Sequence, residues 1–113
     1  MNIADYGKAM TKMYHAYGWD YLYRQLAEEC AELGHASLKL IRALHKETPM
    51  PYEEAADKYI EELADTWLMI AIARTDMTDE EKAAFDRTVA HKYDRLMERI
   101  GGTEGNTPPP LKM

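Results

Sequence analysis

A chain of 113 residues with a net charge of −6 is long enough for one domain with a modest core and too short for two. The negative charge argues against a nucleic-acid polymer as partner, and the single cysteine excludes an internal disulfide framework. No apolar run approaches the roughly 20 residues that cross a bilayer, and the first residues lack a secretory signal. We therefore expect a cytoplasmic protein without a membrane partner.

Two helices are predicted before the prolines in the middle of the chain. The first covers residues 3–17 and ends at Gly18. Asp20 is a candidate N-cap for the second, which runs to about residue 45 or 46. Prolines at positions 49 and 51 then stop it, because proline cannot continue a helix.

Two further helices are predicted after the prolines. The third covers residues 52–74, and the fourth starts from a capping sequence at residues 78–81 and ends near residue 100, beside a Gly-Gly pair. The fold class is therefore all-α, with a four-helix, bundle-like architecture over residues 1–102 as a single domain. Residues 103–113 include three consecutive prolines, and we expect them to form a flexible tail.

Two short acidic segments carry the main functional signal, EECAE at residues 28–32 and EELAD at residues 61–65. Each places two carboxylates three positions apart, on one side of a helix. Two such helices packed face to face gather four carboxylates, which repel one another unless cations lie between them. Oxygen-only clusters of this kind suit Mg²⁺ or Mn²⁺. The four acids are Glu29, Glu32, Glu62 and Asp65.

Helical-wheel positions place these acids beside apolar faces rather than opposite them. Glu29 lies within about 60° of the centre of a leucine stripe, and Glu62 is bordered by Thr66 and Met69. An unpaired buried carboxylate costs several kcal/mol, so an inward acid needs a metal, a cation or a proton. The leucine stripe consists of Leu22, Leu26, Leu33, Leu40 and Leu44.

Other residues near these motifs receive ordinary structural interpretations. Glu61 is expected on a solvated face, as are the first-turn acids Glu53 and Glu80. Cys30 lies on the apolar stripe and is predicted to be a small buried residue. Trp67 is predicted to lie in the core or in an interface.

With these motifs on two helices of a small all-α chain, the sequence resembles the MazG-like all-α nucleoside triphosphate pyrophosphohydrolases. That superfamily also includes dimeric dUTPases and phosphoribosyl-ATP pyrophosphohydrolases. The resemblance covers residues 17–99 and is closest in QLAEECAELGHASLKLIRAL, which continues from the acidic motif into Lys39 and Arg42. The stretch between Glu32 and Glu62 is at the long end of what the family shows.

The resemblance implies a MazG-type fold completed by homo-oligomerisation, as a homodimer or a homotetramer. It implies that Glu29, Glu32, Glu62 and Asp65 coordinate Mg²⁺. The reaction would be hydrolysis of a nucleoside triphosphate to the monophosphate and pyrophosphate, in a nucleotide house-cleaning role. Glu28 is next to the proposed ligand Glu29 in the sequence. It is a candidate catalytic base, or a hydrogen-bond acceptor that supports the metal ligands without touching the ion itself.

A triphosphate substrate also needs cations and groups that recognise the nucleotide. Lys92 and Arg95 lie on one stripe of the fourth helix, where the family places basic residues near the phosphates. Lys39 lies on the same flank as Glu32, one to two turns further along. Gln25 precedes Glu29 by one turn and is a candidate to read a base edge or to hydrogen-bond a ligand acid.

Two alternatives remain open. Glu32 and His35 form a Glu-x-x-His element, which ferritin-like di-iron proteins use twice, but this chain has it only once. The chain could also be a non-catalytic helical dimerisation or regulatory protein with a vestigial metal site.

Overall fold

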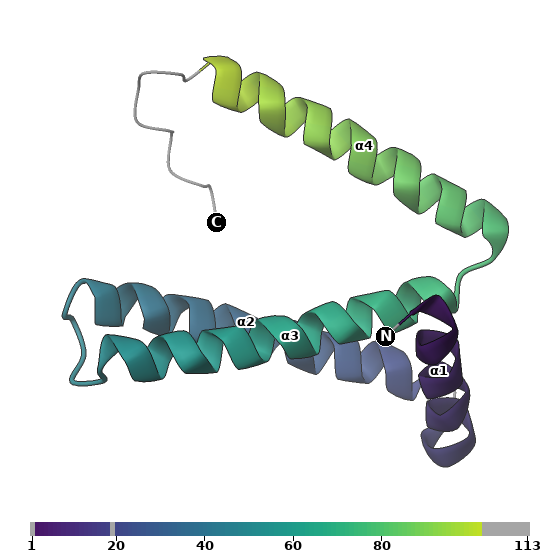
Figure 1. The fold of residues 1–113 in the computed structure, drawn as a ribbon, viewed down its shortest axis with the longest axis horizontal. Helices are drawn as coiled ribbons and strands as arrows, with labels where there is room; N and C mark the ends of the chain where they lie inside the picture. Colours follow the sequence, from purple (N-terminus) through teal and green to yellow (C-terminus); the bar gives the residue numbers. More distant parts are fainter. Residues whose placement is uncertain (1, 19, 103–113) are drawn as a thin grey trace. The chain divides into compact units, whose positions relative to one another are not determined.

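The computed structural model describes residues 2–18 and 20–102, and over these residues it is all-helical, with no strand (Figure 1). This confirms the predicted all-α class. The predicted tail, residues 103–113, lies outside the described residues. The helices are α1 (Ile3–Tyr17), α2 (Tyr21–Leu44), α3 (Tyr52–Thr75) and α4 (Asp79–Gly102).

The chain divides after Asp76 into two compact units. The first holds α1, α2 and α3, which pack on one another, and the second holds α4. A single domain over residues 1–102 therefore stays a prediction.

The helix boundaries follow local capping groups. α1 starts with a capping box, in which Asn2 Oδ1 accepts from the Asp5 backbone N–H at 3.2 Å and Asp5 Oδ2 accepts from the Asn2 N–H at 2.8 Å. It ends at Gly18, whose φ of 91° favours glycine. The predicted box before α4 is also present, since Thr78 Oγ1 accepts from the Glu81 N–H at 3.1 Å.

The predicted cap at Asp20 is wrong in its chemistry, although α2 does begin at the next residue. Asp20 makes no side-chain cap hydrogen bond. Its carboxylate instead accepts from Arg24 Nε at 3.0 Å, because one helical turn brings these two side chains together. At the other end, α2 stops at Leu44, slightly earlier than predicted, and Lys46 adopts a positive φ of 57° in the turn to α3.

α2 and α3 lie side by side as an antiparallel hairpin, and α1 packs across one end of it (Figure 1). The core at this end is formed by Leu22 of α2 and by Met69 and Ile72 of α3, all three buried. Met10 and Met13 of α1 pack against this cluster. The buried face of α2 thus follows the predicted stripe at Leu22.

A polar group also joins the three helices at this end. Asp76, which follows α3, accepts a hydrogen bond of 3.0 Å from the Tyr23 hydroxyl of α2. Tyr14 of α1 hydrogen-bonds the same carboxylate. Burial, this hydrogen bond and the charge of Asp76 raise the pKa of Tyr14 to about 12. Asp76 therefore links residues from all three helices.

Two burial predictions are wrong, because Cys30 is exposed and Leu44 is 61% exposed. Trp67 is 65% exposed and so does not lie in the core, while its predicted place in an interface stays a prediction. All three residues lie on helix faces that neither α1 nor the facing helix of the hairpin covers. None of the helices in the described part of the chain has the length and apolar character needed to cross a membrane.

Candidate metal centre

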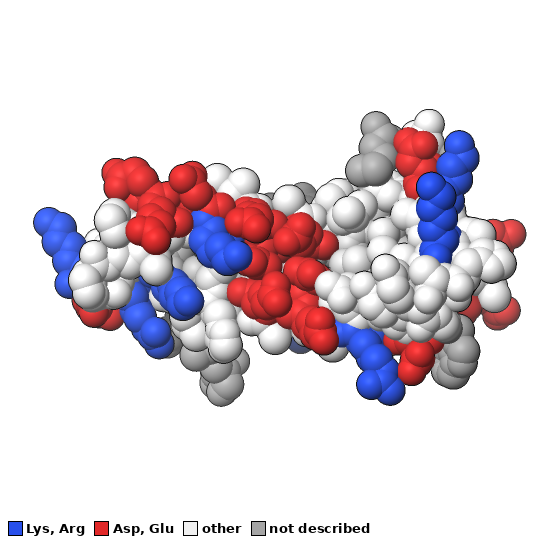
Figure 2. Space-filling model, turned by 90° about the horizontal axis from the view of Figure 1, so that it is seen from below, with Lys and Arg blue, Asp and Glu red and all other residues white. Residues whose placement is uncertain are grey.

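Three of the four predicted metal ligands come together on one face of the α2–α3 hairpin. Carboxylate oxygens of Glu29 and Glu32 of α2 and Glu62 of α3 all lie within 4.8 Å of one another. Figure 2 shows acidic side chains gathered in the middle of this face. The antiparallel pairing produces the cluster, because it brings the acidic flanks of both helices to the same side of the hairpin.

Thr66 holds the two acid-bearing helices in register at this level. Its hydroxyl oxygen lies 2.8 Å from the backbone carbonyl oxygen of Glu62 and 3.2 Å from that of Glu29. The second contact crosses from α3 to α2, so it fixes the height of Glu29 relative to Glu62. Thr66 is buried, and solvent therefore does not compete for these contacts.

Glu62 is the most buried acid of the cluster, with 3% of its surface exposed. Its Oε1 accepts from Lys58 Nζ at 2.8 Å, one turn earlier on α3. This hydrogen bond lowers the pKa of the Glu62 carboxyl. The ion pair with Lys58 therefore favours the charged form of the Glu62 carboxyl.

Glu32 is exposed and behaves in the opposite way. Its hydrogen bond to Glu62, together with the negative charges of Glu62 and Glu29, raises the pKa of the Glu32 carboxyl. The ionised form of Glu32 is therefore less favourable than that of an isolated glutamate. A proton on Glu32 would relieve part of the repulsion within the cluster.

Glu29 is half-buried and its two oxygens differ. Its Oε1 accepts from Gln25 Nε2 at 2.8 Å, so Gln25 hydrogen-bonds a predicted ligand acid, which is one of its two predicted roles. Its Oε2 is buried and has no hydrogen-bond partner, and the same holds for Oε2 of Glu62. Buried carboxylate oxygens are costly without a partner, so both atoms call for a cation or a donor.

Asp65 does not join Glu29 and Glu32. It forms a second group with Glu62 and Glu61, whose carboxylate oxygens also lie within 4.8 Å of one another. Asp65 and Glu61 are both exposed. Glu62 belongs to both groups and is therefore the residue that connects the predicted ligands.

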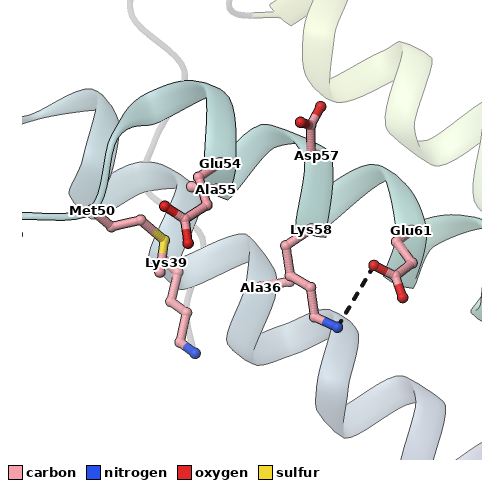
Figure 3. A pocket seen from close by; sticks show the side chains of 8 residues that line it. All are labelled: Ala36, Lys39, Met50, Glu54, Ala55, Asp57, Lys58 and Glu61. Atoms are coloured by element: carbon pink, nitrogen blue, oxygen red, sulfur yellow. Dashed lines mark ion pairs between the residues drawn. The ribbon is translucent and has the colours of Figure 1, made fainter.

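Two adjoining cavities lie along the hairpin beside the cluster. One of about 220 Å³ is lined by Glu32 and Glu62 and also by His35, while a larger one of about 390 Å³ extends toward the α2–α3 turn. Lys39 of α2 and Lys58 of α3 line both cavities and come from facing helices (Figure 3). The larger cavity is lined by Ala36, Lys39, Met50, Glu54, Ala55, Asp57, Lys58 and Glu61.

The residues present fit a divalent metal ion. All ligand atoms are carboxylate oxygens, which Mg²⁺ and Mn²⁺ prefer, and two of them are buried without a partner. Oxygens on opposite sides of an octahedral Mg²⁺ lie about 4.2 Å apart, given metal–oxygen distances of about 2.1 Å. A group spanning up to 4.8 Å reaches that geometry through small side-chain rotations.

The remaining predicted site residues do not join the cluster. Glu28 is exposed and belongs to neither acidic group. Lys92 and Arg95 are exposed on α4, in the second unit, and their contact with phosphates stays a prediction. His35 lines the smaller cavity but is in neither group, which does not favour a di-iron site.

Sequence reasoning missed Lys58. The signal was its position one turn before Glu62, where opposite charges on a helix attract each other. It was missed because such pairs are common on solvated faces, and only the burial of Glu62 makes this one part of a site. No protein-family model, curated protein or solved structure matches the chain.

Proposed function

We propose that this chain hydrolyses a nucleoside triphosphate to the monophosphate and pyrophosphate in a Mg²⁺-dependent reaction. The observation that carries the proposal is the pair of buried carboxylate oxygens, on Glu29 and Glu62, that lack a partner within a three-acid cluster. The resemblance of the two acidic motifs to MazG-like pyrophosphohydrolases supports the reaction type, the MazG-type fold and a homo-oligomeric state.

The proposed metal ligands are Glu29, Glu32, Glu62 and Asp65. Asp65 lies in the second acidic group, and it is proposed to reach the ion because that group also contains Glu62. A bound divalent ion neutralises phosphate oxygens and lowers the pKa of water. Gln25 orients Glu29 through its hydrogen bond. These roles assign the acids to ion binding rather than to contact with the nucleotide.

The phosphates are proposed to lie beside the cluster, in the cavities that Lys39 and Lys58 line. These two lysines offer positive charge from facing helices, which suits an anionic chain bound between them. In the reaction a water oxygen bonds to the α-phosphorus while the bond to the α–β bridging oxygen breaks, and pyrophosphate leaves. Glu28 is the candidate that accepts the proton of the water, and Lys92 and Arg95 are proposed as further phosphate contacts.

Release of pyrophosphate from a panel of ribo- and deoxyribonucleoside triphosphates tests this proposal, with Mg²⁺ and with EDTA. We expect Mg²⁺-dependent release from at least one nucleotide. Glu29→Gln and Glu62→Gln should each abolish it and leave the helical circular dichroism unchanged. Glu53→Gln is the matched control, because Glu53 is an exposed first-turn acid of α3 outside both acidic groups. Unchanged turnover in both site variants would overturn the proposed site.

A second candidate is a non-catalytic helical dimerisation or regulatory protein that keeps a vestigial metal site. The observation in its favour is the number of large apolar side chains exposed on the hairpin, including Trp67. Absence of pyrophosphate release across the panel, from folded protein that still binds Mn²⁺ in solution, would favour this candidate.

A further inference from the structure

The two lysines beside the acidic cluster differ in what they contact. Lys58 Nζ donates to Oε1 of Glu62 at 2.8 Å and lies 3.8 Å from Oε2 of Glu61. Lys39 lines the same two cavities from α2 and makes no ion pair among the described residues. The charge of Lys39 is therefore open to an anion, whereas the charge of Lys58 is already taken by carboxylates.

Lys58 is the movable member of its ion pair. The side chain of Lys58 is 55% exposed, whereas that of Glu62 is only 4% exposed. A lysine ammonium lies at the end of a flexible four-carbon stem, so it can turn to a new partner while the helix stays in place. Lys58 lines both cavities, with Glu62 in the wall of the smaller one and Glu61 in the wall of the larger one (Figure 3).

An anion that takes Lys58 in the absence of a divalent ion must first break the pair with Glu62. Oε2 of Glu62 is buried and has no hydrogen-bond partner, so the loss of Lys58 would leave this buried carboxylate without a cation. Removing one partner of a buried ion pair is strongly unfavourable. Without a divalent ion, we therefore expect an anion in the cavities to contact Lys39 but not Lys58.

Glu62 no longer needs Lys58 once a divalent ion is bound at the cluster. The ion replaces the positive charge that Lys58 supplies, and Oε2 of Glu62 is the ligand atom that has no partner. A divalent ion and an ammonium group beside one carboxylate also repel each other. Binding of the ion therefore favours release of Lys58 from Glu62.

We infer that Lys58 changes partner, from Glu62 in the metal-free protein to a tetrahedral oxyanion in the cavities once a divalent ion is bound. Each ligand alone has to break the pair of Lys58 with Glu62, whereas the two ligands together break it only once. The ion and the anion therefore raise each other's affinity by the same factor. This inference rests on the metal site and the phosphate position of the proposed function, but not on hydrolysis.

Sulfate binding to the full chain tests the exchange, measured by NMR chemical-shift titration in saturating Mg²⁺ and in EDTA. Sulfate has the charge and shape of a phosphate dianion and binds free Mg²⁺ only weakly. We expect sulfate to bind the wild type at least about 5-fold more tightly in Mg²⁺ than in EDTA. Lys58→Met should lose most of this ratio, because only the charge of the ion then favours sulfate. Lys39→Met is the matched control, since it should weaken binding in both conditions and keep the ratio.

Two results would overturn the exchange, whatever the pyrophosphate assay shows. The first is an equal ratio of sulfate affinities in the wild type and in Lys58→Met. The second is a wild type that binds sulfate no more tightly in Mg²⁺ than in EDTA. The expected ratios in a protein that releases no pyrophosphate would support the exchange and would count against hydrolysis alone.

If Lys58→Met does not fold, acetylation of the wild type by acetic anhydride decides, with each lysine followed by mass spectrometry. An amine held in an ion pair reacts slowly because it gives up its proton less readily. Lys58 should therefore react faster in Mg²⁺ than in EDTA, and more slowly again when sulfate is added to the Mg²⁺ sample. Lys8, which is exposed on α1, should react equally in all three. Equal rates for Lys58 in the three samples would overturn the exchange.

Discussion

Lys58 Nζ lies 2.8 Å from Oε1 of Glu62, so a lysine of α3 supplies positive charge to the most buried acid of the cluster. The same lysine lies 3.8 Å from Glu61 Oε2, and these interactions raise the pKa of the Lys58 amine. A divalent ion and Lys58 would both neutralise Glu62. The lysine therefore stabilises the cluster when no divalent ion is bound and competes with an ion for the same charge.

Replacing Lys58 with methionine tests this relationship. In EDTA we expect Lys58→Met to have a lower thermal midpoint than the wild type, because Glu62 loses its partner. In Mg²⁺ the variant should gain more stability than the wild type gains, since no lysine competes with the ion. Lys8→Met, at an exposed position of α1, is the control. An equal Mg²⁺ effect in both variants would contradict the competition.

Removal of the Thr66 hydroxyl should loosen the hairpin beside the acids. Thr66→Val keeps the shape of the side chain but loses the contacts to the carbonyl oxygens of Glu29 and Glu62. We expect a loss of about 1 kcal/mol in the free energy of unfolding, measured in urea. Thr11→Val should cost less, because Thr11 is exposed and its hydroxyl donates only within its own helix. An equal loss in both variants would show that the contact between helices adds nothing.

The stabilising effect of Mg²⁺ should depend on the protonation of Glu32. The pKa of Glu32 is raised, chiefly by its hydrogen bond to Glu62, and metal binding requires the carboxylate. The rise in thermal midpoint that Mg²⁺ causes should therefore be lost as the pH falls through this raised pKa, before an ordinary glutamate is protonated. Scans in Mg²⁺ and in EDTA, from about pH 8 to about pH 4, measure this effect.

In EDTA the contribution of Glu32 has the opposite sign. A group whose pKa is raised by folding stabilises the fold fully below its unfolded pKa, and this contribution is lost as the pH rises through the folded pKa. Glu32→Gln should therefore remove this loss in EDTA and should also weaken the effect of Mg²⁺. Glu53→Gln should change neither the pH dependence of stability in EDTA nor that in Mg²⁺. If Glu32→Gln keeps the pH dependence of the wild type, the effect does not come from Glu32.

Ionisation of the Tyr14 hydroxyl should lower the free energy of unfolding at high pH. Burial and the hydrogen bond to Asp76 raise its pKa from 10.0 to about 12. Its contribution is fully present below about pH 10 and is lost as the pH rises through about 12. Urea unfolding across this range should show the loss in the wild type and a smaller one in Tyr14→Phe. Tyr93→Phe, at an exposed position of α4, should behave like the wild type.

The helices were predictable because their limits are set locally. Gly18 ends α1, and Thr78 and Glu81 cap α4 through contacts within a few residues. Asp20 shows the limit of this reasoning, because a capping residue can instead pair with a base one turn later. Whether Trp67 is buried depends on which helix covers its face, and the wheel of one helix does not contain that information.

The candidate site was predictable in outline for a similar reason. Equal i, i+3 spacings on two helices brought Glu29 and Glu32 close to Glu62 once the helices were antiparallel. Asp65 instead belongs to a second acidic group, because of side-chain directions that the spacing of residues in the sequence does not determine. The role of Lys58 was not predicted, because it follows from the burial of Glu62, and that burial is visible only in the packed hairpin.

The contact between Thr66 and Glu29 joins residues 37 positions apart and marks where the acids meet as the hairpin closes. Closing α2 against α3 brings like charges together during the folding reaction itself, so the cluster opposes the step that forms it. Divalent ions should therefore accelerate folding as well as slow unfolding. Stopped-flow refolding in Mg²⁺ and in EDTA would separate the two rates, and the speed of hairpin closure would then report how early the ion is captured.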